Sequence, residues 1–271
     1  MRLDSLMFEQ GLTPSREKAR SLIMAGKVSV DGKPAQKPGM EIKDTARIAI
    51  AEDPVPFVSR GGLKLEKAVN TFELHLEGRI AADIGASTGG FTDCMLQHGA
   101  AKVYALDVGY GQLDWKLRND PRVIVMERTN ARNMLPDWYD PLPSFASIDV
   151  SFISLRLILE PLYACLAEEA EVIALIKPQF EAGRAEVGKH GVVRDIAVHQ
   201  EVCRRVITQA LEFRFALCGL SFSPVTGPKG NIEFLSYFKK SKENSASLPQ
   251  DFTELIQETV QQAHTLLLHP V

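Results

Sequence analysis

The sequence predicts an α/β protein whose main domain is a doubly wound, mostly parallel sheet ending in an antiparallel hairpin, preceded by a small α+β domain. Apolar runs of strand length alternate with helical stretches between residues 59 and 240, and this alternation builds a parallel sheet with helices on its faces. The last two runs follow each other across a Gly/Pro turn, as in a hairpin. The charge is also unevenly distributed. Residues 1–50 are basic, with nine Lys/Arg and six Asp/Glu, whereas the whole chain has a net charge of −3.

The first predicted domain covers residues 1–50. Apolar residues at helical spacing predict a short helix that ends before Gly11, and a second helix over 14–25 that has proline in its first turn. An alternating strand over 27–33 runs into an Asp-Gly dipeptide, which is typical of a tight hairpin turn. A last strand over 47–50 closes the domain.

Residues 51–58 hold two prolines and are predicted to be a linker. The main domain covers 59–240, and 241–271 is predicted to be a polar linker with a helical tail. The predicted parallel strands are 79–84, 102–107, 122–126, 145–150 and 171–176, and the predicted hairpin strands are 215–223 and 232–238.

The composition, 45% hydrophobic and 24% charged over 271 residues, is that of a soluble chain large enough for a full catalytic core. The N-terminus has acids where a signal peptide needs an apolar core, and no apolar run approaches the roughly 20 residues that span a bilayer. The four cysteines have no paired spacing, so we predict buried thiols in a reducing compartment rather than zinc ligands or disulfides. These features predict a cytoplasmic protein without a metal site.

A glycine-rich loop, DIGASTGGF over 83–91, lies between a predicted strand and a predicted helix. Such a loop lets the backbone approach a ligand that side chains would block. A pyrophosphate fingerprint would need glycine at position 87, which is serine, and Asp83 would repel a phosphate but suits the ammonium group of a methionine. Asp107 ends the next strand, where it can accept hydrogen bonds from both hydroxyls of a ribose. The loop therefore favours S-adenosylmethionine over NAD.

Over residues 2–39 a helix, a GKV strand and a DG turn follow one another, and this segment closely resembles the S4 RNA-binding domain. The resemblance implies that its cations face structured RNA, where they would contact phosphates that carry affinity but little sequence information. The alternative is a solvated charged helix face. The residues predicted to contact RNA are Arg2, Arg16, Lys18, Arg20, Lys27, Lys37 and, at the start of the main domain, Arg60.

Seven motifs are spread along the rest of the chain: SRGGLKL (59–65), DIGASTGGFTD (83–93), DVGYGQLDWKLRNDPRV (107–123), ERTNAR (127–132), DVSFISL (149–155), ALIKPQFEAG (174–183) and GPKGNIEF (227–234). Together they resemble the TlyA family of S4-fused ribosomal RNA 2′-O-methyltransferases, some of which carry the name haemolysin, and whose catalytic domain is similar to FtsJ/RrmJ. The resemblance implies a catalytic tetrad at Lys64, Asp149, Lys177 and Glu233. With the loop, it implies a cofactor site at Asp83, Gly85, Ala86, Ser87, Gly89, Gly90, Phe91, Asp107, Asn130 and Asp149.

The chemistry explains why such a tetrad is useful. A ribose hydroxyl is a poor nucleophile until its proton is removed, and a lysine can remove it near neutral pH only if burial and a neighbouring cation lower its pKa well below about 10.4. We therefore predict Lys177 as the base, with Lys64 as the neighbouring cation and Glu233 as an orienting group. Asp149 would steer Lys177 and contact the methyl donor, so transfer depends on alignment rather than on a covalent intermediate or a metal.

The predicted function is methylation of a ribose 2′-hydroxyl in ribosomal RNA, in cytidine as the resemblance implies, with ribosomal subunits as partners. One alternative is a ribosome-assembly factor without turnover, which the complete tetrad argues against. Another is a haemolysin, which conflicts with the lack of an apolar span. Two local features also stay open: Phe152 and Phe180 are either core residues or stacking faces for a flipped base, and 181–194 is either a flap on RNA or a solvated loop.

Overall fold

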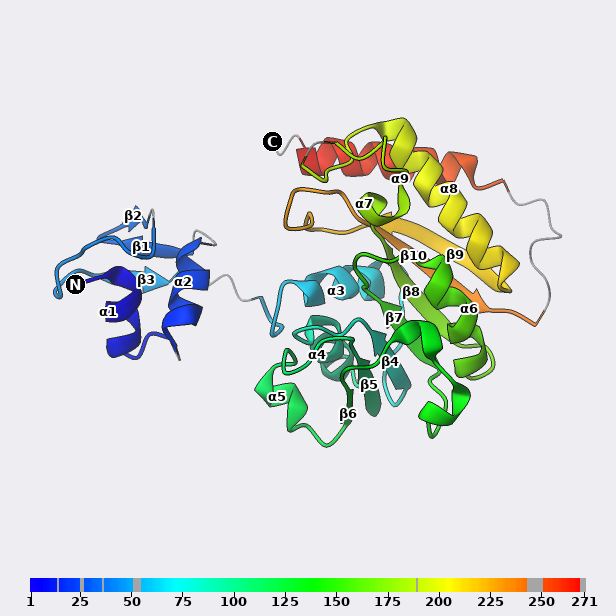
Figure 1. Ribbon diagram of the computed structural model, residues 1–271, viewed down its shortest axis with the longest axis horizontal. Coiled ribbons are helices and arrows are strands. Elements are labelled where there is room, and N and C mark those ends of the chain that lie inside the picture. Colours follow the sequence, from blue (N-terminus) through cyan, green and yellow to red (C-terminus); the bar gives the residue numbers. More distant parts are fainter. Residues whose placement is uncertain are drawn as a thin grey trace. The chain divides into compact units, whose positions relative to one another are not determined.

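The computed structural model describes residues 1–13, 15–24, 27–35, 37–50, 55–188, 190–242 and 251–268. These residues form two compact units, Met1–Pro54 and Val55–Val271, the first in blue and the second from cyan to red in Figure 1. Each unit has its own buried apolar core. The predicted limits of the second helix at 14 and 25, the first half of the predicted linker (51–54) and residues 243–250 and 269–271 of the tail lie outside the described residues.

The first unit is a small antiparallel sheet packed against two helices. Its sheet has the order β2-β1-β3. Val30 pairs with Lys33 across Asp31 and Gly32, which have φ angles of +50° and +77°, so the predicted Asp-Gly hairpin turn is confirmed. The elements are α1 (Leu3–Glu9), α2 (Arg16–Met24), β1 (Val28–Val30), β2 (Lys33–Pro34) and β3 (Ile48–Ile50).

The second unit is built on a seven-stranded sheet with the order β6-β5-β4-β7-β8-β10-β9. The first five strands in that order are parallel, and β10 runs antiparallel to both of its neighbours. The predicted parallel strands and terminal hairpin are therefore confirmed, with the second hairpin strand inside the sheet and the first at its edge. The strands are β4 (Ile80–Ile84), β5 (Lys102–Leu106), β6 (Val123–Met126), β7 (Phe145–Ile148), β8 (Glu171–Ile176), β9 (Phe215–Phe222) and β10 (Phe234–Lys240).

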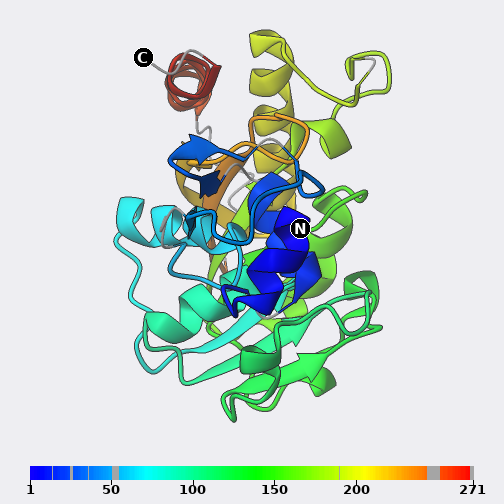
Figure 2. The same ribbon diagram turned by 90° about the vertical axis from the view of Figure 1, so that its left-hand side faces the viewer.

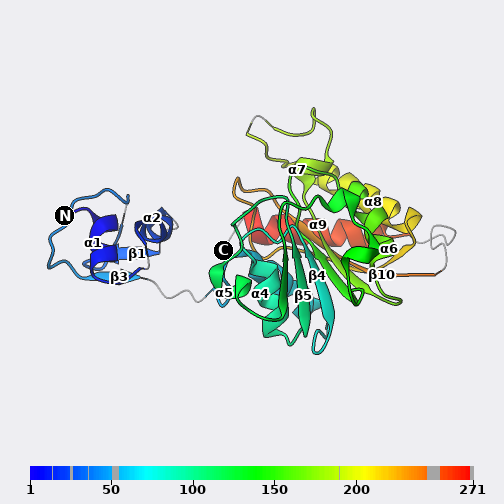
Figure 3. The same cartoon turned by 60° about the horizontal axis from the view of Figure 1, so that its bottom comes forward.

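Helices cover both faces of this sheet (Figures 1 and 3). One apolar cluster joins Ala82 and Ile84 of β4 to α6, α8 and α9, and another joins Ala81 to α3, α4 and α5, because successive strand side chains point to opposite faces. All six residues of β8 are buried, as a strand covered on both sides requires. The helices are α3 (Gly61–Thr71), α4 (Gly90–Gln97), α5 (Trp115–Arg118), η1 (Ala131–Asn133), η2 (Pro136–Trp138), α6 (Arg156–Cys165), α7 (Pro178–Glu181), α8 (Ile196–Glu212) and α9 (Thr253–Leu268).

Two peripheral segments differ in how they are held. The segment between α7 and α8 is a long loop that stands out from the second unit (Figures 2 and 3), and it returns to the body at Val192 and Val193, which are buried. The C-terminal helix α9 packs on α8 and β9, with Ile256 and Val260 almost inaccessible to solvent. The predicted helical tail therefore belongs to the core of this unit.

Cys218 corrects the prediction that all four cysteines are buried. Cys94, Cys165 and Cys203 are buried, but Cys218 is exposed. The ladder pairs Tyr237 with Gly219 and the next residue of β10 with Leu217, which leaves Cys218 as the extra residue of a β-bulge. A bulged residue on an edge strand has no partner to cover it, so its thiol meets solvent.

The second half of the predicted linker also differs from a free connection. Residues 55–58 belong to the second unit, and the Phe57 side chain is buried there. It lies so close to Gly62 that a Cβ at that position would approach the ring to 2.3 Å. The backbone N–H of Val58 donates to Oδ2 of Asp93 at 2.8 Å.

Candidate active site

The loop after β4 requires glycine at two positions. Gly85 has a φ of +90°, and a Cβ there would lie 2.6 Å from the carbonyl oxygen of Asp149. Gly89 has a φ of +95°, and a Cβ there would lie 2.3 Å from the Leu117 side chain. Only glycine combines this backbone conformation with so little space. As a result, the loop backbone lies directly against the end of β7.

The first turn of α4 lies against the start of α3, again through glycines. A Cβ on Gly90 would come within 2.3 Å of the Ser59 hydroxyl oxygen and 2.8 Å of the Gly62 backbone nitrogen. This close contact places the N-terminal turn of α3, which carries Lys64, beside the glycine loop. The SRGGLKL motif therefore supplies both the close packing and the lysine.

Asp83 lies beneath the loop. Its side chain is fully buried, its Oδ2 accepts a hydrogen bond from the Thr92 hydroxyl at 2.7 Å, and its Oδ1 accepts one from the Ser147 hydroxyl at 3.1 Å. Burial raises the pKa of Asp83 to about 7, although the two hydroxyl hydrogen bonds act in the opposite direction. Because the Asp83 side chain is fully buried beneath the loop, this placement gives no support to the predicted direct contact with a methionine ammonium group.

Asp107 directly follows β5, and its carboxylate joins the glycine loop to the loop after β5. Its Oδ2 accepts from the backbone N–H of Ser87 at 2.8 Å, and its Oδ1 accepts from that of Gly109 at 2.6 Å. Each carboxylate oxygen has a further lone pair, so the contact with ribose hydroxyls stays a prediction compatible with this geometry. Asn130 caps η1, with its side-chain oxygen accepting from the backbone N–H of Arg132 at 3.1 Å.

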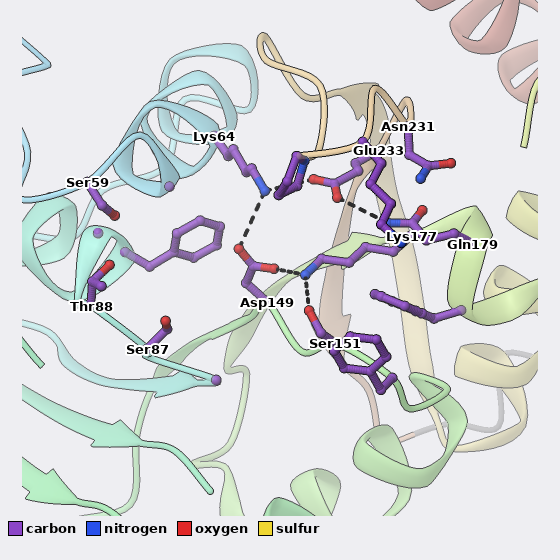
Figure 4. Close-up of a pocket in the computed structure, with 18 of the residues that line it drawn as sticks. Ser59, Lys64, Ser87, Thr88, Asp149, Ser151, Lys177, Gln179, Asn231 and Glu233 are labelled. Carbon is purple, nitrogen blue, oxygen red and sulfur yellow. Dashed lines mark hydrogen bonds and ion pairs between the residues drawn. The ribbon is translucent and has the colours of Figure 1, made fainter. Parts of the chain in front are cut away.

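Four element ends bring the predicted tetrad together. Asp149 and Lys177 directly follow β7 and β8, and the carboxyl ends of parallel strands lie at the same edge of a sheet. Phe234 pairs with Ile176 across the antiparallel β8–β10 ladder, so Glu233 lies level with Lys177. Lys64 reaches the same place from α3, and Figure 4 shows the four side chains pointing toward one another.

The four side chains, called the quartet below, form a continuous series of ion pairs (Figure 4). Nζ of Lys177 lies 2.5 Å from Oδ1 of Asp149. The other oxygen of Asp149 lies 3.6 Å from Nζ of Lys64, which donates a hydrogen bond of 2.7 Å to Oε2 of Glu233. Asp149 thus lies between the two amines, with one oxygen toward each.

The quartet is largely withdrawn from water. The exposed fractions of its side chains are 12% for Lys64, 18% for Asp149, 10% for Lys177 and 2% for Glu233. Burial by itself would lower the pKa of Lys64, but attraction to the carboxylates of Asp149 and Glu233 outweighs it, so the pKa is raised. Two amines and two carboxylates together carry no net charge, which limits the cost of burying four ions.

Three residues that the sequence did not single out hold the quartet in place. Ser151 accepts a hydrogen bond from Nζ of Lys177 at 3.0 Å, and Nε2 of Gln179 donates to Oε1 of Glu233 at 3.4 Å. Gly227 leaves room for Glu233, because a Cβ there would lie 2.8 Å from the same oxygen. The sequence contains a signal for two of them. A polar residue stands two positions after each residue that follows a strand, Ser151 after Asp149 and Gln179 after Lys177.

A cavity of about 670 Å³ opens between the quartet and the glycine loop, a size typical of small-molecule sites. All four quartet residues line it. Of the predicted cofactor residues, those that line it are Gly85, Ala86, Ser87, Gly90, Phe91 and Asp149. Those outside its lining are Asp83, Gly89, Asp107 and Asn130.

Two aromatic side chains also line this cavity. Phe152 is 90% exposed, has a φ of +64°, and its ring centroid lies 4.8 Å from that of Phe180. The interpretation of Phe152 as a core residue is therefore wrong. Phe180 is half-buried, and an aromatic pair at a pocket with one exposed ring is suited to stacking on a planar group.

In the first unit, a buried carboxylate holds two of the arginines predicted to contact RNA. Arg2 donates to both oxygens of Asp4, at 3.0 and 2.9 Å, and Nη2 of Arg16 lies 3.9 Å from Oδ2. The hydrogen bonds from Arg2 are the main cause of the lowered pKa of Asp4. The two guanidinium groups thus meet at one point of the surface. Of the other predicted cations, Lys27 is half-buried and the exposed ones are Lys18, Arg20, Lys37 and, in the second unit, Arg60.

Two kinds of feature are missing from the described residues. No group of three or more His, Cys, Asp or Glu side chains in this part of the chain could hold a metal ion. None of the helices in the same residues has the length and apolarity to cross a membrane.

The fold and the cavity together define a methyltransferase of the doubly wound class, and comparisons with known proteins agree. Residues 57–240 match the FtsJ-like methyltransferases and residues 1–48 match the S4 domain. The chain is 50% identical over 269 residues to Bacillus subtilis YqxC, provisionally named an rRNA methyltransferase, covering 98% of this chain and 95% of that protein. It is 42% identical over 247 residues to the Mycobacterium tuberculosis 16S/23S rRNA (cytidine-2′-O)-methyltransferase TlyA, covering 91% and 92%.

A solved structure from Streptococcus thermophilus, provisionally described as a hemolysin, is 49% identical with a TM-score of 0.79, covering 98% of this chain and 96% of that one. The chain belongs to the FtsJ-like methyltransferase family. Its methyl donor is S-adenosylmethionine. The residues present fit this group, because the cavity has a suitable volume and the glycine loop lines it with Gly85, Ala86 and Ser87.

Proposed function

We propose that this protein transfers a methyl group from S-adenosylmethionine to the 2′-hydroxyl of a cytidine ribose in ribosomal RNA. The observation that carries the proposal is the quartet, because the Lys177 amine lies in the same cavity as the glycine loop. The substrate is supported by a relative that is named as an rRNA (cytidine-2′-O)-methyltransferase. The S4 domain of the chain supports an RNA substrate in general.

Within the quartet, Lys177 is the proton acceptor of the proposed reaction. Lys64 is unsuited to that role, because its raised pKa keeps it protonated at neutral pH and its amine already donates to Glu233. To act as acceptor, Lys177 first releases its ammonium proton to solvent; the quartet then has a net charge of −1, which the positive charge of bound S-adenosylmethionine offsets. After taking the proton, Lys177 again pairs with Asp149.

Bound S-adenosylmethionine supplies a methyl group on a positively charged sulfur, which an oxygen nucleophile can take by direct displacement. The chain's own contribution is alignment of the two reactants. We assign the backbone of Gly85, Ala86 and Ser87 to hold the donor, with Asp107 at its ribose and Asp149 near its reactive end. Asp83 then acts indirectly, by holding α4 to the sheet through Thr92 and Ser147.

On the RNA side, Phe152 and Phe180 offer stacking faces at the cavity, and the cations of the first unit contact RNA phosphates. Arg2 and Arg16 carry this role most directly, because Asp4 fixes both. Fixed cations of this kind supply affinity, and the site supplies the choice of ribose. We further propose ribosomal subunits as the partners and the cytoplasm, where they are assembled, as the location.

The test is transfer of labelled methyl groups from S-adenosylmethionine to separated small and large ribosomal subunits that lack the modification. We expect the label in ribosomal RNA, at a cytidine whose 3′ linkage resists alkali, since a methylated 2′-oxygen cannot attack the phosphate. Label on a base, or none in RNA, contradicts the proposal.

The same preparation separates the other two functions. Tight binding to a subunit without any transfer would indicate an assembly factor. Release of dye from liposomes by the purified protein would support a haemolysin, and we expect none.

A further inference from the structure

One wall of the cavity is built from two segments far apart in the sequence. One is the turn over 224–231 between β9 and β10. Within it, the backbone N–H of Gly227 donates to the carbonyl of Asn231 at 2.9 Å and that of Gly230 donates to Gly227 at 2.8 Å. The turn is thus closed by its own hydrogen bonds immediately before Glu233.

Asn231 joins this turn to the second segment, the end of the loop between α7 and α8. Its side-chain oxygen accepts from the backbone N–H of Val193 at 3.0 Å, and its Nδ2 donates to the carbonyl of Gly191 at 2.9 Å. Asn231 and Val193 are each only 2% exposed. Buried hydrogen bonds of this kind hold the two segments as one wall.

Lys229 lies on this wall and lines the cavity. A Cβ on Gly191 would lie 3.6 Å from its Nζ atom, so the amine rests beside the second segment. Among the charged residues that line the cavity in the described part of the chain, Lys229 alone stands outside the quartet. The described residues place no carboxylate within ion-pair distance of it, and its side chain is exposed. Because the quartet is balanced, Lys229 gives the described lining residues an excess positive charge.

We propose that the Nζ atom of Lys229 binds a backbone phosphate of the RNA strand beside the ribose that is methylated. This inference rests on the proposed function. In RNA the 2′-hydroxyl is adjacent to the carbon that carries the 3′-phosphate, so a ribose presented to Lys177 brings a phosphate into the same cavity. A lysine ammonium is a compact charge that pairs with phosphate without demanding one orientation, which suits a strand of any sequence.

The test compares full-length wild type with Lys229→Gln in binding to ribosomal subunits that lack the modification, over about 50 to 200 mM salt. Loss of one phosphate contact reduces the slope of log affinity against log salt by about 0.7 to 0.9, which corresponds to about five- to eightfold weaker binding near 0.1 M salt. The KM for the subunit should rise while kcat at saturation stays close to wild type. This is expected when the lost contact stabilises the bound substrate and the transition state equally. Lys229→Arg should restore binding.

Lys242→Gln is the matched control, because Lys242 is 76% exposed and pairs with Glu168 beyond the far end of β10. It should change neither the salt slope nor the KM. An unchanged slope in Lys229→Gln overturns the proposal, and so does a loss of S-adenosylmethionine affinity in a titration without RNA, which would point to a structural role. The proposed function is tested separately by the wild-type protein: it fails if wild type transfers no methyl group to a ribose.

Discussion

Nζ of Lys177 lies 2.5 Å from Oδ1 of Asp149, while the second oxygen of that carboxylate faces Lys64. One acid therefore contacts both the lysine assigned as proton acceptor and the lysine assigned as fixed cation. Removing the charge of either amine therefore changes the electrostatic interaction of Asp149 with the other amine. The quartet is thus one electrostatic unit, and its substitutions should behave as such.

Substitution of the proposed base should separate chemistry from binding. Lys177→Ala should lower the rate of methyl transfer about 100-fold or more, the usual contribution of a general base. Affinity for S-adenosylmethionine and for ribosomal subunits should stay close to that of wild type, because other residues carry both. Single-turnover transfer and equilibrium titrations measure these quantities. Transfer at the wild-type rate would remove Lys177 from the mechanism.

Lys64 and Glu233 should be strongly coupled, since their charged groups are 2.7 Å apart and both nearly buried. We expect Lys64→Met and Glu233→Gln to be non-additive by about 0.5–3 kcal/mol in the free energy of unfolding, as for contacting residues in one network. Urea denaturation of both single variants and the double variant gives this coupling. Lys67→Met is the control on the same helix, because its amine lies over the Phe222 ring. The effect of Lys67→Met on the free energy of unfolding should be additive with that of Glu233→Gln.

Gly85→Ala should cost stability and cofactor affinity together. The new Cβ would meet the Asp149 carbonyl oxygen at 2.6 Å in a backbone with a φ of +90°. Gly78→Ala is the matched comparison, because Gly78 has a φ of +70° but no atom within 4 Å of the added carbon. We expect about 1 kcal/mol of destabilisation for Gly78→Ala from its backbone conformation alone. Gly85→Ala should exceed this value in denaturation and should also bind S-adenosylmethionine more weakly; equal behaviour of the two variants would contradict the close approach.

The His199–His264 pair between α8 and α9 should make stability depend on pH. Nδ1 of His199 lies 2.8 Å from Nε2 of His264. Burial, and then His264, lower the pKa of His199 from 6.5 to about 4, while Asp195 acts in the opposite direction. The unfolded chain therefore takes up this proton first as the pH falls. The free energy of unfolding should decrease between pH 6.5 and 4, by at most roughly 3 kcal/mol from this residue.

The variant His199→Gln isolates that contribution. Asp83 changes the free energy of unfolding in the opposite direction. Its carboxyl pKa is raised to about 7, so it adds stability as the pH falls through that value. The difference between wild type and His199→Gln cancels the Asp83 contribution. Denaturation curves measured across this pH range should give a smaller acid loss for the variant, and parallel curves would show that His199 is not the group responsible.

Asp4→Asn should weaken RNA binding even though it removes a negative charge from a basic unit. The Asp4 carboxylate orients Arg2 and Arg16, so its loss frees both guanidinium groups and reduces the phosphate contacts that depend on their positions. The control is Asp44→Asn, an exposed carboxylate that lies 3.6 Å from the N-terminal amine. It should leave affinity for ribosomal subunits unchanged or slightly higher. Tighter binding by Asp4→Asn would show that net charge alone governs this unit.

Much of the fold follows from local patterns that a single sequence displays. The alternation of apolar runs with helical segments located the seven strands of the second unit, and the central ones most clearly, because burial on both faces makes a strand mostly apolar. The Asp31-Gly32 turn could be predicted because both residues tolerate a positive φ. Asp149 and Lys177 were visible as candidates because each ends an apolar strand at the edge where such sheets bind ligands.

Only the tertiary structure placed Glu233 level with Lys177, since that relationship is set by the register of two antiparallel strands distant in the sequence. The same holds for Gln179 against Glu233, for Asn231 between two loops, and for the inward direction of Asp83. A residue's neighbours in its own segment determine its backbone conformation, so the sequence by itself determined the elements and their order. Which side chains meet depends on packing among segments far apart in the chain, and the folded structure alone decides it.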